Sequence, residues 1–236
     1  MRTYCNRGAL RRFGHKVDLI VTETFARPRI IVEMTAPEKA EKHSATEGMT
    51  VWLTGLPSAG KTTIGLQVTE RLRAAGLNVE FLDGDVIRKH LFRELGYTKH
   101  DRDENVLRLA FLAQLLSRNG VIVLVAAIAP YRAIRAQIRE SSGNFVEVYV
   151  NAVPSVCEQR DVKGLYRKAR QGELVGFTGV DDPYEPPLQP EVECRTDQET
   201  IDQSTAKVLG YVLGRLPAST AIDVRKRLQM PHSLLS

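Results

Sequence analysis

The chain of 236 residues is long enough to bury one well-filled core with length to spare at both ends. Its hydrophobic content of 43% is that of an ordinary globular protein, and no apolar run approaches the ~18 residues of a membrane span. The formal charge of +5 is only mildly basic and comes without a dense Lys/Arg run with interleaved aromatics, so the composition argues against a nucleic-acid partner and against a membrane partner.

Residues 1–48 differ in character from the rest of the chain. Their start is Arg-rich and acid-poor, which faintly resembles an organelle transit peptide, but acidic residues soon interrupt it. We expect a poorly ordered extension or the product of an upstream start codon, because Met49 opens the next, regular segment. The sparse cysteines (Cys5, Cys157 and Cys194) indicate a reducing compartment and predict a cytoplasmic protein.

From Met49 on, strand-like and helix-like segments alternate. We expect strands at 50–53, 78–82, 121–127, 145–150 and 192–196, and helices at 61–75, 86–95, 101–120, 131–140, 154–161 and 198–216. Asp101 is a plausible cap for the helix at 101–120. This alternation predicts an α/β fold with a mostly parallel five-stranded sheet and helices on both faces, in which a ligand lies after the first strand.

The domain boundaries follow from the same pattern. One domain is expected over 49–214, and 215–236 form a C-terminal tail without a clear role. Over about 160–187, the segment that we take as a mobile lid, the periodicity fades and Gly, Pro and charge accumulate, which predicts a helical piece followed by a long surface loop. No internal repeat is evident.

The stretch "GLPSAGKTT" between the first strand and the first helix fits the phosphate-binding P-loop, Gly-x4-Gly-Lys-Thr. Its glycines allow backbone N–H groups to turn around phosphate oxygens, Lys61 reaches the terminal phosphates, and Thr62 can bind Mg²⁺. We therefore predict ATP as co-substrate, Mg²⁺ as cofactor with Thr62 as its ligand, and ATP binding by Gly55, Leu56, Pro57, Ser58, Ala59, Gly60, Lys61 and Thr62.

The second strand ends in "LDGD". Asp83 and Asp85, two residues apart beside a triphosphate, can serve as base for an acceptor hydroxyl and as partner of Mg²⁺-bound water. A plain turn is the alternative reading, because Asp-Gly is a turn dipeptide anywhere. An Asn-Lys-x-Asp stretch is missing, which argues against GTP specificity.

Further along, "GYTKHDRDEN" combines an aromatic face, a guanidinium and an amide in Tyr97, Arg102 and Asn105, with Arg88 one helix earlier. These groups suit a purine nucleotide with an anionic group, although a solvated helix start would look the same. The cations of the lid, from Arg160 and Lys163 onward, would suit closure over a transferring phosphate, but a run of charges is also what a solvated face shows.

Six segments together, "GLPSAGKTT", "LDGD", "LGY…DRDEN", "IAPYR", "RDVKGLYRKAR" and "GFTGVDDPYEPP", resemble the adenylyl-sulfate kinase (APS kinase) family from about Met49 to Leu213. The resemblance implies a P-loop kinase fold, a homodimer, and phosphorylation of the 3′-hydroxyl of adenosine 5′-phosphosulfate by MgATP to give 3′-phosphoadenosine 5′-phosphosulfate, in sulfate assimilation. It also raises the possibility of an ATP sulfurylase as partner. It implies catalytic roles for Lys61, Asp83 and Asp85, with Asp85 as the base, and substrate contacts from Arg88, Tyr97, Arg102, Asn105, Ile128, Ala129, Lys163, Leu165 and Phe177, the two aromatics sandwiching the adenine.

The chain departs from the family pattern at two positions. Ala129 replaces the Ser that many members have before Pro130, so no hydroxyl is available there for a phosphoenzyme; direct in-line transfer needs none. Val86 stands where Asn is frequent. Three other readings stay open: a P-loop kinase for a nucleoside or sugar, a non-catalytic sulfonucleotide-binding regulator, and a DNA-binding module.

Overall fold

The central feature of the fold is a five-stranded parallel sheet. The computed structural model describes residues 48–229, so the expected N-terminal extension lies outside the described residues, apart from Gly48. The strands are β1 (Met49–Thr54), β2 (Val79–Asp83), β3 (Ile122–Ala126), β4 (Phe145–Asn151) and β5 (Val192–Arg195). Their order is β2-β3-β1-β4-β5, and all four neighbouring pairs are parallel. The predicted α/β class and parallel sheet are confirmed.

Strand order explains where the ligand site must lie. β1 is the middle strand and is buried along its whole length. The chain moves from β1 to one side of the sheet for β2 and β3, and to the other side for β4 and β5. The order therefore reverses at β1, and ligands of open α/β sheets bind beyond the carboxyl end of the strand at such a point, where the P-loop follows here.

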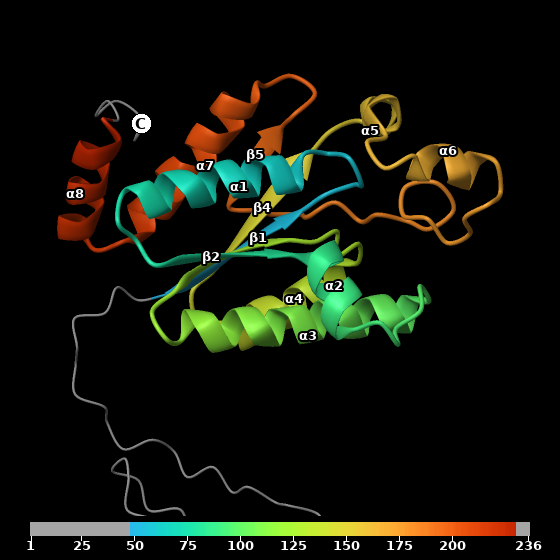
Figure 1. The fold of residues 1–236 in the computed structure, drawn as a ribbon, viewed down its shortest axis with the longest axis horizontal. Helices are drawn as coiled ribbons and strands as arrows, with labels where there is room; N and C mark the ends of the chain where they lie inside the picture. The colour runs from blue at the N-terminus through green and yellow to red at the C-terminus, as the bar shows by residue number, and fades with distance from the viewer. Residues whose placement is uncertain (1–47, 230–236) are drawn as a thin grey trace, which may run out of the picture. The chain divides into compact units, whose positions relative to one another are not determined.

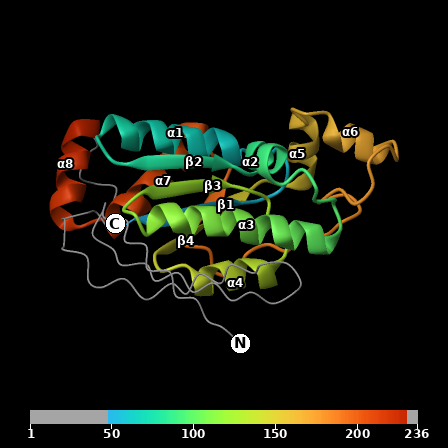
Figure 2. The same cartoon turned by 60° about the horizontal axis from the view of Figure 1, so that its bottom comes forward.

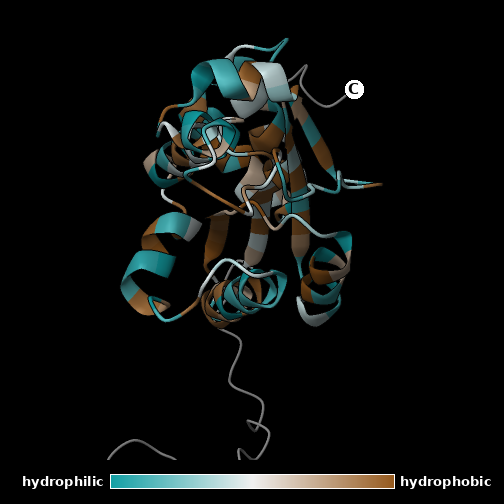
Figure 3. Ribbon diagram, turned by 90° about the vertical axis from the view of Figure 1, so that its right-hand side faces the viewer, coloured by the Kyte–Doolittle hydropathy of each residue, from teal (hydrophilic) through white to brown (hydrophobic). Residues whose placement is uncertain are grey.

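Helices cover both faces of the sheet (Figures 1 and 2). They are α1 (Lys61–Ala74), α2 (Gly84–Leu91), α3 (Lys99–Ser117), α4 (Arg132–Ser141), α5 (Pro154–Arg160), α6 (Leu165–Arg170), α7 (Ile201–Arg215) and α8 (Ala218–Leu228). One buried cluster joins the sheet to α1, α7 and α8, and a second joins it to α3 and α4. Figure 3 shows the resulting hydrophobic strands between helices whose outer sides are hydrophilic.

Helix starts and ends differ from the expected ones where local capping decides. α3 begins at Lys99, because Thr98 accepts from the backbone N–H of Asp101 and the Asp101 side chain accepts from the Thr98 backbone. Asp101 is thus the inner half of a capping box and not the cap itself. α2 ends at Leu91, four residues earlier than expected, because the chain turns there and buries Phe92.

Part of the expected C-terminal tail is helical. α8 buries Ala221 and Val224 in the core cluster that also holds α1. Arg227 Nη1 donates to the backbone oxygen of Ala75, the C-cap of α1, at 2.7 Å. α8 thus supports the helix that begins at the P-loop. Among the helices of residues 48–229, none combines the length and apolar character needed to cross a membrane.

Candidate active site

The P-loop lies between β1 and α1, as predicted. Gly55 has a φ of 153°, and a Cβ there would lie 2.3 Å from the backbone oxygen of Val150, so only glycine fits this turn. Ser58 and Gly60 also have positive φ angles, of 61° and 107°. Because α1 begins at Lys61, its first backbone N–H groups and the positive end of its dipole point at the loop.

Lys61 lies over its own loop. Its Nζ donates to the backbone oxygens of Gly55 at 2.9 Å and of Leu56 at 2.7 Å. Desolvation by burial lowers the pKa of Lys61 from 10.5 to about 8, an effect that the nearby negative charges of Asp85 and Asp83 partly offset. The ammonium is therefore held where phosphate oxygens would meet it, close to both carboxylates.

The two carboxylates of "LDGD" have different surroundings. Asp83 is the N-cap of α2: its Oδ1 accepts from the backbone N–H groups of Asp85 and Val86 at 2.9 and 3.2 Å, and its Oδ2 accepts from Thr62 Oγ1 at 2.9 Å. Asp85 has a side chain that is 73% exposed and pairs with Lys163 from the lid. The hydrogen bond to Asp85 raises the pKa of Lys163. Asp83 is thus fixed by the fold, whereas Asp85 is held only by a residue of the lid.

The residues predicted to bind the acceptor nucleotide form a second group, with Arg88 on α2, Tyr97 just before α3 and Arg102 in the first turn of α3. The guanidinium of Arg88 lies 4.6 Å from the ring centroid of Tyr97, and Arg102 Nε donates to the Tyr97 backbone oxygen at 2.9 Å. The two terminal nitrogens of Arg102 reach the lid, where they donate to Gly176 O and Thr178 Oγ1. Arg102 therefore joins α3 to the segment that contains the predicted lid aromatic.

The two predicted lid residues nearest to the core are Leu165 and Phe177. Phe177 is only 8% exposed, and its ring meets Tyr166 edge-on with centroids 4.9 Å apart. Leu165 begins α6 and packs against the same buried cluster. Tyr97, by contrast, is 66% exposed. The structure thus brings one aromatic into the core and leaves the other on the surface.

The remaining predicted contacts, Asn105, Ile128 and Ala129, lie on α3 and after β3. The Asn105 Oδ1 atom is buried without a hydrogen-bond partner in the described part of the chain. The Ile128 backbone oxygen accepts from Thr54 Oγ1 at 2.6 Å, at the end of β1. Ala129 is buried and has a φ of 42°.

Sequence reasoning did not single out several residues that the structure places here. Tyr131 Oη donates to Asp182 Oδ1 at 2.9 Å, and the carboxylate of Asp182 lies 3.7 Å from Arg102 Nη1. Thr196 Oγ1 donates to the Ala59 backbone oxygen at 2.7 Å, behind the P-loop, beside Arg160. Tyr131 and Asp182 belong to "IAPYR" and "GFTGVDDPYEPP", so the motifs were a signal that they matter, but not of how they pair.

The match to a protein family identifies the kind of protein that carries this site. Residues 47–195, more than half of the chain, match the family model described as Adenylylsulphate kinase. The chain belongs to the adenylyl-sulfate kinase family. Curated relatives of this kinase include the adenylyl-sulfate kinase of Rippkaea orientalis (strain PCC 8801 / RF-1), 59% identical over 172 residues that cover 70% of this chain and 95% of that protein. The adenylyl-sulfate kinase of Microcystis aeruginosa (strain NIES-843 / IAM M-2473) is also 59% identical, over 70% of this chain and 94% of that protein.

Solved structures agree with this assignment. The kinase is 38% identical to the Mycobacterium tuberculosis APS kinase CysC, solved in complex with AMPPNP and APS, with a TM-score of 0.68 over 70% of this chain and 98% of that one. A gluconokinase from Sinorhizobium meliloti 1021, 20% identical with a TM-score of 0.50, shares the fold alone. The predicted family and the P-loop kinase fold are confirmed.

Proposed function

We propose that this kinase phosphorylates the 3′-hydroxyl of adenosine 5′-phosphosulfate by direct in-line transfer from ATP, with Asp85 as the acceptor base. The reaction, which yields 3′-phosphoadenosine 5′-phosphosulfate for sulfate assimilation, is that of its family. The observation that carries the proposal is the grouping of Lys61, Thr62, Asp83 and Asp85 at the carboxyl end of β1 and β2, with Lys163 of the lid on Asp85.

On the donor side, the P-loop backbone and the start of α1 bind the phosphates of ATP, and the Lys61 ammonium stabilises charge on the transferring group. The Thr62 hydroxyl and the Asp83 carboxylate, 2.9 Å apart, are hard oxygen ligands of the kind that Mg²⁺ prefers. We propose that Thr62 binds Mg²⁺ directly and that Asp83 holds its hydration shell. When bound with ATP, the ion supplies positive charge that neutralises the phosphate oxygens.

On the acceptor side, Asp85 is suited to be the base because it is exposed, whereas Asp83 is engaged by two backbone N–H groups and Thr62. When Lys163 leaves Asp85 for an anionic substrate, the carboxylate can accept the proton of the 3′-hydroxyl. Ala129 offers no hydroxyl, so a phosphoenzyme at that position is excluded by its side chain.

The nucleotide acceptor is proposed to lie against the group at the start of α3. Arg88 and Arg102 carry positive charge for the phosphosulfate, and Asn105 brings a buried, unpartnered Oδ1 that can accept a hydrogen bond. Tyr97 and Phe177 are proposed to hold the adenine, with contacts from Ile128, Ala129, Lys163 and Leu165.

We also propose that the kinase is a cytoplasmic homodimer, with an ATP sulfurylase as a possible supplier of its substrate. Support comes from the family resemblance and from Cys157 and Cys194, which are buried and form no disulfide within the described residues. Mass photometry of the full chain tests the dimer.

The direct test of the proposed function is ADP release from MgATP with four acceptors in parallel: adenosine 5′-phosphosulfate, AMP, a nucleoside and gluconate. We expect ADP release only with the sulfated nucleotide. Turnover with it would show that the kinase is active with Ala129 in place of serine. Turnover with gluconate or the nucleoside instead would replace this proposal with a different small-molecule kinase.

A further inference from the structure

The backbone after β3 is strained at Ala129. Its φ of 42° lies in the left-handed region, which is unfavourable for any residue with a Cβ, and the residue is only 2% exposed. Such a conformation persists only where the surrounding structure holds it. The groups that hold Ala129 are therefore of interest for the site.

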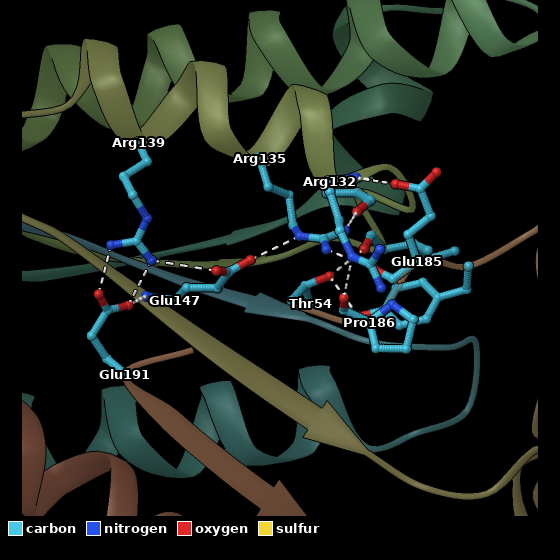
Figure 4. A network of polar contacts seen from close by, with 11 residues as sticks. Thr54, Arg132, Arg135, Arg139, Glu147, Glu185, Pro186 and Glu191 are labelled. Carbon is cyan, nitrogen blue, oxygen red and sulfur yellow. Dashed lines mark hydrogen bonds and ion pairs between the residues drawn. The ribbon is translucent and has the colours of Figure 1, made fainter. Parts of the chain in front are cut away.

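Arg135 of α4 donates a hydrogen bond to the backbone of Ala129, and Figure 4 shows the polar contacts around Arg135. Arg135 is 3% exposed and uses three nitrogens on three different segments. Its Nη1 donates to the Ala129 backbone oxygen at 2.6 Å, its Nη2 to the Glu185 backbone oxygen at 2.6 Å, and its Nε to Glu147 Oε1 of β4 at 2.8 Å. One buried guanidinium thus joins the turn after β3 to the C-terminal end of the lid.

The same turn is held from the other side by the end of β1. Thr54, which directly precedes the P-loop, donates through Oγ1 to the Ile128 backbone oxygen at 2.6 Å and lies 3.0 Å from Tyr184 Oη. The Arg135 guanidinium lies 5.8 Å from the ring centroid of Tyr184. Ile128 and Ala129 are therefore fixed between the P-loop strand and Arg135, and both Thr54 and Arg135 also contact the C-terminal end of the lid.

We infer that Arg135 is a positioning residue for the acceptor nucleotide, acting through Ala129 and Glu185. The inference rests on the proposed role of Ile128 and Ala129 as substrate contacts. A planar guanidinium can serve three acceptors in fixed directions, whereas the ammonium of a lysine cannot reproduce that fork. Replacing Arg135 by Lys keeps a positive charge beside Glu147 but releases the strained turn.

Arg139, one turn later on α4, supplies a matched control. It pairs with Glu191 at 2.6 Å and with Glu147 at 3.3 Å, and it has no hydrogen bond to Ala129 or Glu185 (Figure 4). Arg139→Lys therefore disturbs the same ion network on the same helix without touching the substrate turn.

The experiment measures KM for adenosine 5′-phosphosulfate at saturating MgATP, KM for ATP, and Tm, for the full chain and both variants. We expect Arg135→Lys to raise KM for the sulfated nucleotide about tenfold, as the loss of one or two hydrogen bonds implies, with KM for ATP within about twofold of the original. Arg139→Lys should lower Tm without changing either KM by more than about twofold.

An unchanged KM for the sulfated nucleotide in Arg135→Lys, or an equal rise in Arg139→Lys, would overturn the inference and leave Arg135 a purely structural residue. If Arg135→Lys does not fold, the double variant Arg135→Gln/Glu147→Gln removes both charges of the pair, so that no buried charge is left unpaired, and should show the same rise. If the unaltered kinase did not use the sulfated nucleotide at all, the proposed function itself would fail. Failure of the inference alone would instead appear as normal turnover by the unaltered kinase with an unchanged KM in Arg135→Lys.

Discussion

The phosphate-donor half and the acceptor half of the site are built in different ways. In the donor half, Lys61 bonds to carbonyl groups five and six residues away in its own loop. In the acceptor half, Arg102 reaches Gly176 over 74 residues, and Thr54 reaches Tyr184 over 130. The donor half takes its shape mainly from a local motif, to which Thr196 adds one long-range hydrogen bond at Ala59, whereas the acceptor half depends on distant segments that pack together.

This difference predicts how substitutions in each half of the site should act. A change in the donor half or at the base Asp85 should abolish phosphoryl transfer but leave the affinity for the acceptor measurable. These groups are proposed to contact the transferring phosphate or the proton of the acceptor hydroxyl. A change among the long-range contacts should alter acceptor affinity first, because it displaces segments that other residues share. Four predictions test this division.

The largest effect is expected for Asp85→Asn. Loss of the acceptor base should lower kcat by about 10²- to 10⁴-fold, while the Kd for ATP, measured by calorimetry, stays within about threefold. Lys163→Met, which removes the lid partner of Asp85 but leaves the carboxylate, is the companion variant and should retain more of kcat. Full activity of Asp85→Asn would contradict the assignment of Asp85 as the acceptor base.

The next effect is expected at Arg102, the link between α3 and the lid. Arg102→Lys loses the fork that donates to Gly176 and Thr178, and KM for adenosine 5′-phosphosulfate should rise by about 10- to 100-fold with little change in KM for ATP. The control is Arg108→Lys on the same helix, whose pairs with Glu94 and Glu104 lie at the surface. Similar kinetics for the two variants would contradict a special role for Arg102.

A smaller effect concerns pH and the donor half alone. Because the pKa of Lys61 is lowered to about 8, its charge is present below that pH and is lost as the pH rises through it. The Kd for ATP should therefore increase about tenfold between pH 7 and pH 9. In Lys61→Arg the guanidinium keeps its charge over this range, so the pH dependence should vanish even if affinity is reduced. Equal slopes for both proteins would assign the titration to another group.

The smallest effect compares two capping boxes. Thr98→Ala removes the N-cap of α3, and Thr200→Ala removes that of α7. Each should lower the free energy of unfolding by about 1 kcal/mol, measured by urea denaturation. Only Thr98→Ala should also raise KM for the sulfated nucleotide, by about two- to fivefold, because the first turn of α3 carries Arg102. If Thr200→Ala raised KM equally, the acceptor half would not be separable from general stability.

By itself, the sequence determined the donor half and the sheet. The continuous apolar run at 121–127 predicted β3, because a strand covered on both faces has no polar side to alternate with, and the short β-rich run at 50–53 predicted β1. The P-loop followed from its glycines, since the turn at Gly55 leaves no space for a Cβ. Family motifs named the acceptor residues and the lid, but as an unconnected set.

Only the tertiary structure decided how the acceptor half is held together. The pairing of Arg102 with Gly176, of Tyr131 with Asp182 and of Arg135 with Glu185 joins segments that lie 50 or more residues apart in the chain. Helix α8 likewise could not be predicted, because Ala221 and Val224 give only a weak apolar face that is stabilised by packing near α1. Local patterns encode turns and periodicity, whereas contacts over many tens of residues depend on which surfaces the folded sheet brings together.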